Sequence, residues 1–286
     1  MFITTQTPQD AQLLEIMSIL QKASQMLLDE YRHYCAGKAF EVESKYDQSP
    51  VTQADLKVNQ FILQQLALFS PDIPVLSEEN DHSDRQQWES CWMLDPLDGT
   101  KEFLHRRDEF TINLSLIQNH QTVFSAIAVP CEQLVYLGYL TELPYRYSFE
   151  TQHWERYCKY KDNEEDAVQI GLSHRSKNPK YQQYIEYIEQ EIPVIRREAG
   201  SAYKFCMMLE GEIDIYPRFH PTSEWDTSAG QGLLESIGGG LVSLSAVPFT
   251  YNQRSTVLNE GFIAFRNENN QKIALDALQS VLVQSE

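Results

Sequence analysis

The sequence of 286 residues predicts a globular protein of the mixed α/β (α+β) class. Two apolar stripes at helical spacing fall between residues 10 and 70. A β-rich stretch with short polar breaks follows, and in the second half short apolar runs alternate with helical patterns. Hydrophobic residues make up 42% of the chain, which is enough for a sizeable core and argues against disorder.

Two helices are predicted near the N-terminus from the spacing of their apolar residues. Residues 10–34 carry a stripe at spacings of three, four and seven that includes Leu13 and Leu20. A second helix is expected to begin after Thr52 and to end before Pro71, because proline cannot continue a helix. Both are interpreted as scaffold helices that cover a core.

Strands are predicted next. Apolar runs at 73–76 and 91–94 each stop at acidic residues, as strands do when their C-terminal ends carry a site. The two acidic clusters are therefore expected to meet. The segments within 110–149 are rich in β-forming residues and separated by short breaks, which suggests an antiparallel meander.

The polar, charged stretch 151–166 is predicted to separate two lobes. The first, residues 1–165, is an α+β lobe with the antiparallel sheet and most of the candidate metal ligands. The second, residues 166–286, is an α/β lobe expected to supply Asp226 and substrate-binding residues. Its predicted strands are 168–172, 194–197, 213–216, 241–244 and 262–265, and its predicted helices are 177–190, 201–210, 226–237 and 270–284.

Charge and composition exclude several function classes. A formal net charge of −18 argues against binding to a nucleic acid polymer and against strong membrane binding. No run of 18 apolar residues and no basic-then-apolar N-terminus is present, and the five cysteines show no Cys-x-x-Cys spacing, so a cytoplasmic location is expected. If such an acidic protein acts on phosphates, it must neutralise their negative charge locally, and carboxylates that hold divalent cations are the obvious means.

The most specific local pattern is WMLDPLDGTKEF, residues 92–103. Pro96 fixes its φ angle and prevents a regular strand ladder, so the chain can aim Asp95, the Leu97 carbonyl and Asp98 at one point. Hard cations such as Mg²⁺ bind such oxygens. The two aspartates are not spaced as Asp-x-Asp, so a metal site fits better than an aspartyl-phosphate nucleophile.

Gly99 and Thr100 follow directly and have a different role available. If a helix begins there, its free N–H groups form an anion site, and glycine lets a phosphate approach the backbone closely. The alternative is a turn before a helix with Asp98 as its N-cap.

Three further acidic residues are candidates. Glu78 ends the strand-like VLSEE, and Asp226 begins a helix-like segment; the alternatives are a solvated carboxylate for Glu78 and a helix N-cap for Asp226. Asp55 lies three residues after Thr52, which is typical of a capping box. A carboxylate at Asp55 could also accept a proton from an attacking water.

Other enzyme classes lose support. The chain contains no GxxxxGK[ST], no G-x-G-x-x-G, no HExxH and no Cys followed six positions later by Arg. The seven histidines show no ligand spacing, so they are interpreted as surface or core residues and a zinc site is not predicted.

Together, SPVTQAD, VLSEE, DPLDGTKEF and EWDTSAG resemble, in order and spacing, the lithium-sensitive magnesium phosphatases of the inositol monophosphatase superfamily. Within it, the 3'(2'),5'-bisphosphate nucleotidases look most similar. The resemblance runs from about residue 10 to residue 265. It implies a layered α-β-α-β-α sandwich of the sugar and inositol phosphatase type.

The resemblance also implies roles for the acidic residues. Glu78, Asp95 and the Leu97 carbonyl would hold one Mg²⁺, and Asp95, Asp98 and Asp226 a second, with a third, weaker ion expected and inhibition by Li⁺. Asp55 and Thr100 would activate the attacking water, with Glu78 contributing to catalysis. Substrate would contact residues 97–100 together with Glu78 and Asp226.

Substrate choice depends on cations, because a bisphosphate has a second phosphate that the metals do not touch. GSAYKF and YPRF resemble family segments and suggest Ser201, Lys204 and Arg218 as its ligands, with Lys101 a weaker candidate. One departure concerns the base: nucleotidases of this type have S-R-S-H where this chain has SHRS, residues 173–176, which leaves base contacts open.

The expected reaction is hydrolysis of the 3'-phosphate of adenosine 3',5'-bisphosphate (PAP) to AMP and phosphate, with the sulfated analogue PAPS, which would give APS, as a further candidate substrate. The partner is thus a small phosphorylated molecule, and the oligomeric state is left open. One alternative is an inositol or sugar phosphate phosphatase of the same superfamily. Another, of a different class, is a non-catalytic protein that binds metal or nucleotide.

Overall fold

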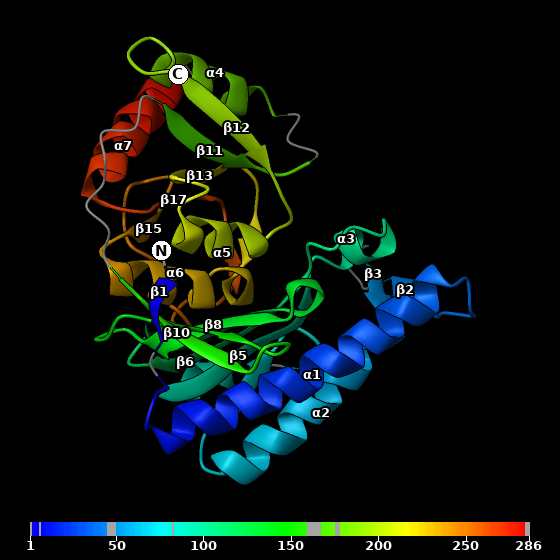
Figure 1. Ribbon diagram of the computed structural model, residues 1–286. Helices are drawn as coiled ribbons and strands as arrows, with labels where there is room; N and C mark the ends of the chain where they lie inside the picture. The colour runs from blue at the N-terminus through cyan, green and yellow to red at the C-terminus, as the bar shows by residue number, and fades with distance from the viewer. Residues whose placement is uncertain are drawn as a thin grey trace.

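The computed structural model describes residues 2–5, 7–44, 50–81, 83–158, 167–174 and 178–283. Its helices and sheets form alternating layers from bottom to top of Figure 1. Helices α1 and α2 cover the outer face of the larger sheet, α5 and α6 lie between the sheets, and α4 and α7 cover the smaller sheet. This is the α-β-α-β-α sandwich that the resemblance implied.

The helices form where the apolar stripes predict them. Asp10 caps the first helix by accepting hydrogen bonds from the amides of Gln12 and Leu13, and Leu13 and Leu20 are buried in its stripe. The helices are α1 Ala11–Cys35, α2 Gln53–Phe69, α3 Thr100–Leu104, α4 Pro179–Ile188, α5 Tyr203–Glu210, α6 Ser228–Ile237 and α7 Glu268–Val283. None of them has the length and hydropathy of a membrane span.

The larger sheet has eight strands in the order β1-β10-β9-β8-β7-β6-β5-β4. Its strands are β1 Phe2–Thr5, β4 Val75–Ser77, β5 Ser90–Asp98, β6 Thr111–Gln118, β7 Gln121–Val129, β8 Leu134–Tyr139, β9 Tyr145–Ser148 and β10 His153–Tyr157. From β5 to β10 each neighbouring pair is antiparallel, which confirms the meander, whereas β4 and β5 are parallel and end at the same edge.

The smaller sheet has five strands in the order β12-β11-β13-β17-β15. They are β11 Val168–Leu172, β12 Val194–Glu198, β13 Ile215–Arg218, β15 Gly240–Ser243 and β17 Phe262–Phe265. Two small ribbons pair β2 Val42–Ser44 with β3 Pro50–Thr52, and β14 Thr222–Ser223 with β16 Leu258–Asn259. The five strands of the smaller sheet are thus within two residues of their predicted positions, whereas β14 and β16 were not predicted.

The polar stretch 151–166, predicted to separate two lobes, begins with a strand of the larger sheet. Residues His153–Tyr157 form β10, which pairs with β9 and β1; Trp154 packs in the core that includes residues of α1 and α2, and Tyr157 packs in the core between the sheets. Residues 159–166, which hold the proposed lobe boundary, lie outside the described part. The division into two lobes stays a prediction; the core between the sheets mixes Ile127 of β7 with Phe205 of α5 and Leu233 of α6.

Candidate active site

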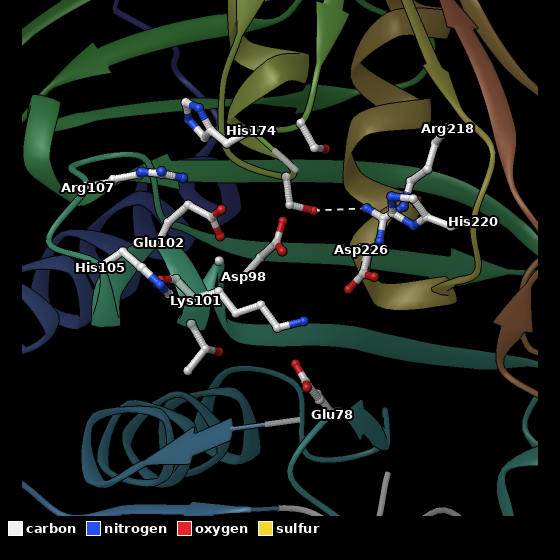
Figure 2. A pocket seen from close by; sticks show the side chains of 14 residues that line it. Glu78, Asp98, Lys101, Glu102, His105, Arg107, His174, Arg218, His220 and Asp226 are labelled. Carbon is white, nitrogen blue, oxygen red and sulfur yellow. Dashed lines mark hydrogen bonds between the residues drawn. The ribbon is translucent and has the colours of Figure 1, made fainter. Parts of the chain in front are cut away.

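A cavity of about 290 Å³ lies where the acidic segment meets loops of the second half. Its lining combines carboxylates with cations, which Figure 2 shows facing one another. The lining residues are Glu78, Asp98, Gly99, Thr100, Lys101, Glu102, His105, Arg107, Ser173, His174, Ser201, Arg218, His220 and Asp226.

Three carboxylates from two distant parts of the sequence meet beside this cavity. One oxygen each of Asp95, Asp98 and Asp226 lies within 4.8 Å of the other two. Asp95 and Asp98 are buried, at 1% and 7% exposure, so water does little to screen the repulsion between their charges. The sequence predicted that these three residues share a metal, and the fold brings them together.

The electrostatics of the cluster call for a cation. Burial, followed by the charges of Glu78, Asp98 and Asp226, raises the pKa of Asp95 well above its ordinary value. Burial and the charge of Asp226 raise the pKa of Asp98 to about 6, and the Ala202 amide and Arg218 act in the opposite direction. Such mutual repulsion is relieved when a divalent cation lies between the carboxylates.

A register shift near the end of strand β5 positions the two aspartates at the site. Its pairing with β6 is regular up to Asp95, opposite Asn113, and then shifts before Asp98, opposite Thr111. The shift falls at Pro96, which has no N–H to donate. Asp95 Oδ1 accepts a hydrogen bond from the Leu97 amide at 3.0 Å, which fixes the turned segment.

Gly99 makes the sharp turn into α3. Its φ is +92°, and a Cβ would lie 3.3 Å from Phe110 Cα, so a side chain there would be strained and crowded. Gly99, not Asp98, is the N-cap of α3. The alternative interpretation of Asp98 as a cap is therefore wrong, and the carboxylate of Asp98 instead accepts hydrogen bonds from the Ala202 amide at 2.7 Å and from Asn113 Nδ2 at 3.3 Å.

Asp55 is both a helix cap and a neighbour of Thr100. Its Oδ2 accepts hydrogen bonds from the amide and hydroxyl of Thr52, at 2.8 and 2.5 Å, which completes the predicted capping box. Its Oδ1 lies 3.4 Å from Thr100 Oγ1, and that hydroxyl is also 3.2 Å from the Leu97 carbonyl. The two oxygens of one buried carboxylate thus have different partners.

Asp226 and Glu78 enter from opposite halves of the chain. Asp226 ends a short 3₁₀ turn, Glu224–Asp226, and caps it by accepting hydrogen bonds from Thr222 Oγ1 and from the Ser223 amide at 3.0 Å. The predicted helix start at Asp226 is therefore wrong by two residues, because α6 begins at Ser228. Glu78 follows β4, and its amide donates to the Leu94 carbonyl at 3.1 Å, so it faces Asp95 from the neighbouring strand.

Arg218 places a partly buried cation beside the carboxylates. Its Nη1 donates to Ser201 Oγ at 3.3 Å, drawn as a dashed line in Figure 2, and its Nη2 donates to the Pro221 carbonyl at 3.4 Å. Its buried Nε has no hydrogen-bond partner among the described residues. Both bonds are long and each terminal nitrogen carries a second hydrogen, so the side chain, which lines the cavity, can still donate to an anion there.

Lys204 does not lie where the sequence placed it. Its side chain is 0% exposed and does not line the cavity, and its ammonium is held by backbone carbonyls beneath the floor. The interpretation of Lys204 as a direct phosphate ligand therefore does not fit this structure.

Three histidines without a predicted role, His105, His174 and His220, line the cavity. His174 Nε2 lies 2.6 Å from Glu109 and its Nδ1 3.4 Å from Glu198, so both ring nitrogens have protein partners. The rest of the SHRS segment, Arg175 and Ser176, lies outside the described residues. Arg107 was missed as well, although it follows DPLDGTKEF closely and that proximity could have indicated it.

The donor set fits Mg²⁺. Buried carboxylates and a carbonyl are the hard oxygen ligands that this ion prefers, and no histidine or cysteine belongs to the cluster found among the described residues. Asp95, Asp98 and Asp226, joined by Glu78 and the Leu97 carbonyl, are the residues that would hold it.

Comparison with known proteins agrees with this geometry. Residues 9–282 match the model of the inositol monophosphatase family. The chain belongs to the inositol monophosphatase family. The match spans every strand of the two sheets except β1, and it includes the positions of the acidic cluster.

Its relatives include proteins named 3'(2'),5'-bisphosphate nucleotidase CysQ. The one from Salmonella typhimurium is 35% identical over 80% of this chain and 90% of its own length, and the one from Aggregatibacter actinomycetemcomitans is 32% identical over 88% and 91%. The solved CysQ of Bacteroides thetaiotaomicron superimposes with a TM-score of 0.74 at 30% identity, covering 89% of this chain and 97% of that one. An inositol monophosphatase of Thermotoga maritima shares the fold, with a TM-score of 0.73 at 18% identity over 95% of this chain and 98% of that one.

Proposed function

We propose that this protein is a Mg²⁺-dependent 3'(2'),5'-bisphosphate nucleotidase that converts PAP to AMP and phosphate. The observation that carries the proposal is the meeting of the Asp55–Thr100 pair with the acidic cluster, because Thr100, Asp98 and Asp226 line one cavity. The names of the relatives at 32 to 35% identity support the substrate.

The metal ligands follow the sequence prediction. Glu78, Asp95 and the Leu97 carbonyl would hold one Mg²⁺, and Asp95, Asp98 and Asp226 a second. Bound Mg²⁺ supplies positive charge against the phosphoryl group and lowers the pKa of water. Inhibition by Li⁺ and a third, weaker ion are part of the same proposal.

Asp55 is the proton acceptor in this proposal. Its Oδ2 is engaged by the helix cap, which leaves Oδ1 to accept a proton that passes through Thr100 Oγ1 from the attacking water. The water oxygen bonds to phosphorus as the bond to the ribose 3'-oxygen breaks. That oxygen takes a proton from a solvent water, and Asp55 then releases the proton it accepted to solvent, which restores the carboxylate. Gly99 lines the cavity, and its backbone is proposed to lie against the phosphate.

Arg218 and Ser201 are proposed to bind the non-reacting phosphate. Arg218 has donors to spare, and the hydroxyl of Ser201 lies beside them in the cavity. Lys101, which also lines the cavity, is an additional candidate. A cytoplasmic location remains a prediction from the sequence.

A substrate panel tests the proposal. The purified protein is assayed for phosphate release from PAP, PAPS, 3'-AMP and inositol 1-phosphate, with and without Mg²⁺ and Li⁺. We expect the highest kcat/KM for the bisphosphates, an absolute need for Mg²⁺ and inhibition by Li⁺. A preference for inositol 1-phosphate would favour the other family activity and overturn the nucleotide assignment.

A further inference from the structure

Lys204 is a buried cation whose hydrogen bonds all go to the protein. Its Nζ donates to the carbonyls of Ala199 and Gly200, both at 2.7 Å, and lies 3.4 Å from Ser173 Oγ. It also lies 4.6 Å from the ring centre of Tyr216. An ammonium has three hydrogens, so none is left for a substrate phosphate.

The two carbonyls belong to a short loop, residues 199–202, that reaches the candidate metal site. Two residues after Gly200, the Ala202 amide donates to Asp98 Oδ2 at 2.7 Å. Between them, Ser201 Oγ accepts the hydrogen bond from Arg218. One loop therefore touches both the carboxylate cluster and the candidate anion ligands.

The loop has little room to move toward the first half of the chain. A Cβ on Gly200 would lie 2.4 Å from the Glu109 carbonyl oxygen, so the backbones are in close contact there. The stem of Lys204 is confined as well, since a Cβ on Gly171 would lie 3.3 Å from Lys204 Cδ. The absence of a side chain at Gly171 therefore leaves room for the stem of Lys204.

We propose that Lys204 is a positioning residue: by binding two consecutive carbonyls of the 199–202 loop, it holds the Ala202 amide against Asp98 and Ser201 beside Arg218. The effect on Asp98 concerns a candidate metal ligand, and the effect on Ser201 and Arg218 rests on the proposed function. Without Lys204, two carbonyls buried beneath the cavity would lose their donor, and the loop would turn to find others.

The surroundings of Lys204 are consistent with this role. Burial and then Arg218 lower its pKa to about 7, while Asp98, Glu102 and Glu109 act in the opposite direction. A neutral amine still has two hydrogens, one for each carbonyl, so the contact with the loop does not require the charge.

The test compares Lys204→Met, which keeps the length of the side chain and removes its donors, with the wild type. Mg²⁺ affinity of the metal-free protein is measured by calorimetry, and kcat and KM are measured for PAP and for 3'-AMP. We expect Mg²⁺ affinity to fall roughly 10-fold or more, as for other residues that orient metal ligands. We expect kcat/KM to fall by the same factor for both nucleotides.

Lys272→Met is the matched control, because it makes the same exchange on the exposed face of α7. It should leave Mg²⁺ affinity and both kcat/KM values at wild-type levels. If Lys204→Met does not fold, as judged by its melting curve, Lys204→Gln replaces it; its amide keeps two hydrogens, so we expect a smaller loss of Mg²⁺ affinity with the same equal effect on both nucleotides.

Two outcomes would overturn the proposal. A rise in KM for PAP alone, with unchanged Mg²⁺ affinity, would make Lys204 a direct ligand of the second phosphate. Unchanged Mg²⁺ affinity together with unchanged kinetics would remove any role at the site. If the wild type hydrolyses neither nucleotide, the proposed function fails, while the Mg²⁺ titration still decides whether Lys204 positions Asp98.

Discussion

Thr100 Oγ1 lies 3.4 Å from Asp55 Oδ1, although 45 residues separate the two along the chain. The contact joins the first turn of α2 to the start of α3, directly beside the acidic segment. It leaves the helix cap intact, because the cap uses the other carboxylate oxygen. A residue that stabilises a helix thereby stays available for proton transfer.

Asp55→Asn is expected to lower kcat by roughly 10²- to 10⁴-fold, the range for loss of a general base. The amide oxygen of Asn can still accept a hydrogen bond at the cap, so the melting temperature should change little. Stopped assays with PAP and a thermal melt measure the two effects. Full activity in the variant would contradict the proton-acceptor role of Asp55.

Mg²⁺ is expected to raise the melting temperature of the wild type, because a ligand that binds only the folded state stabilises it by about 2.7 kcal/mol at 100 times its Kd. Asp95→Asn should abolish this shift and the activity together. The same variant should melt higher than the wild type in the absence of metal, since it removes one of several repelling carboxylates. An undiminished Mg²⁺ shift in Asp95→Asn would exclude Asp95 as a ligand.

Arg218→Met is expected to reduce the preference for a second phosphate. Loss of a charge-assisted contact costs on the order of 1.5–3 kcal/mol, or about 10- to 100-fold in kcat/KM. The loss should be greater for PAP than for 3'-AMP, which has no second phosphate. Equal losses for both substrates would assign Arg218 to the reacting phosphate instead.

The cysteines are expected to differ in reactivity. Burial, and then the charge of Glu224, raise the pKa of Cys91 to about 12, and burial with Asp108 raises that of Cys131 to about 12. A raised thiol pKa keeps the unreactive protonated form at pH 8. Mass spectrometry after brief alkylation of the folded protein should find label on the exposed Cys35 and Cys158.

Unfolding the protein should expose the remaining thiols to the same reagent. Labelling of Cys91 at the rate of Cys35 in the folded protein would contradict the buried position of Cys91.

The sequence alone predicted the features of this protein that depend on neighbouring residues. The Thr52–Asp55 capping box, the break at Pro96 and the glycine turn into α3 depend on residues a few positions apart, so their pattern is visible in the chain. The layered fold and the acidic cluster followed from four such segments and their resemblance to one family.

Only the tertiary structure distinguished Lys204 from Arg218. Both cations lie in segments that resemble the family, but the ammonium of Lys204 is bound by two backbone carbonyls, while the guanidinium of Arg218 lines the cavity and keeps a hydrogen on each terminal nitrogen for another acceptor. The same holds for His174, which is held by carboxylates from two other segments. A polar group can bind a ligand only if the fold has not already given hydrogen-bond partners to all of its donors and acceptors. Those partners can come from segments far away in the sequence, so the spacing of residues along the chain does not reveal them.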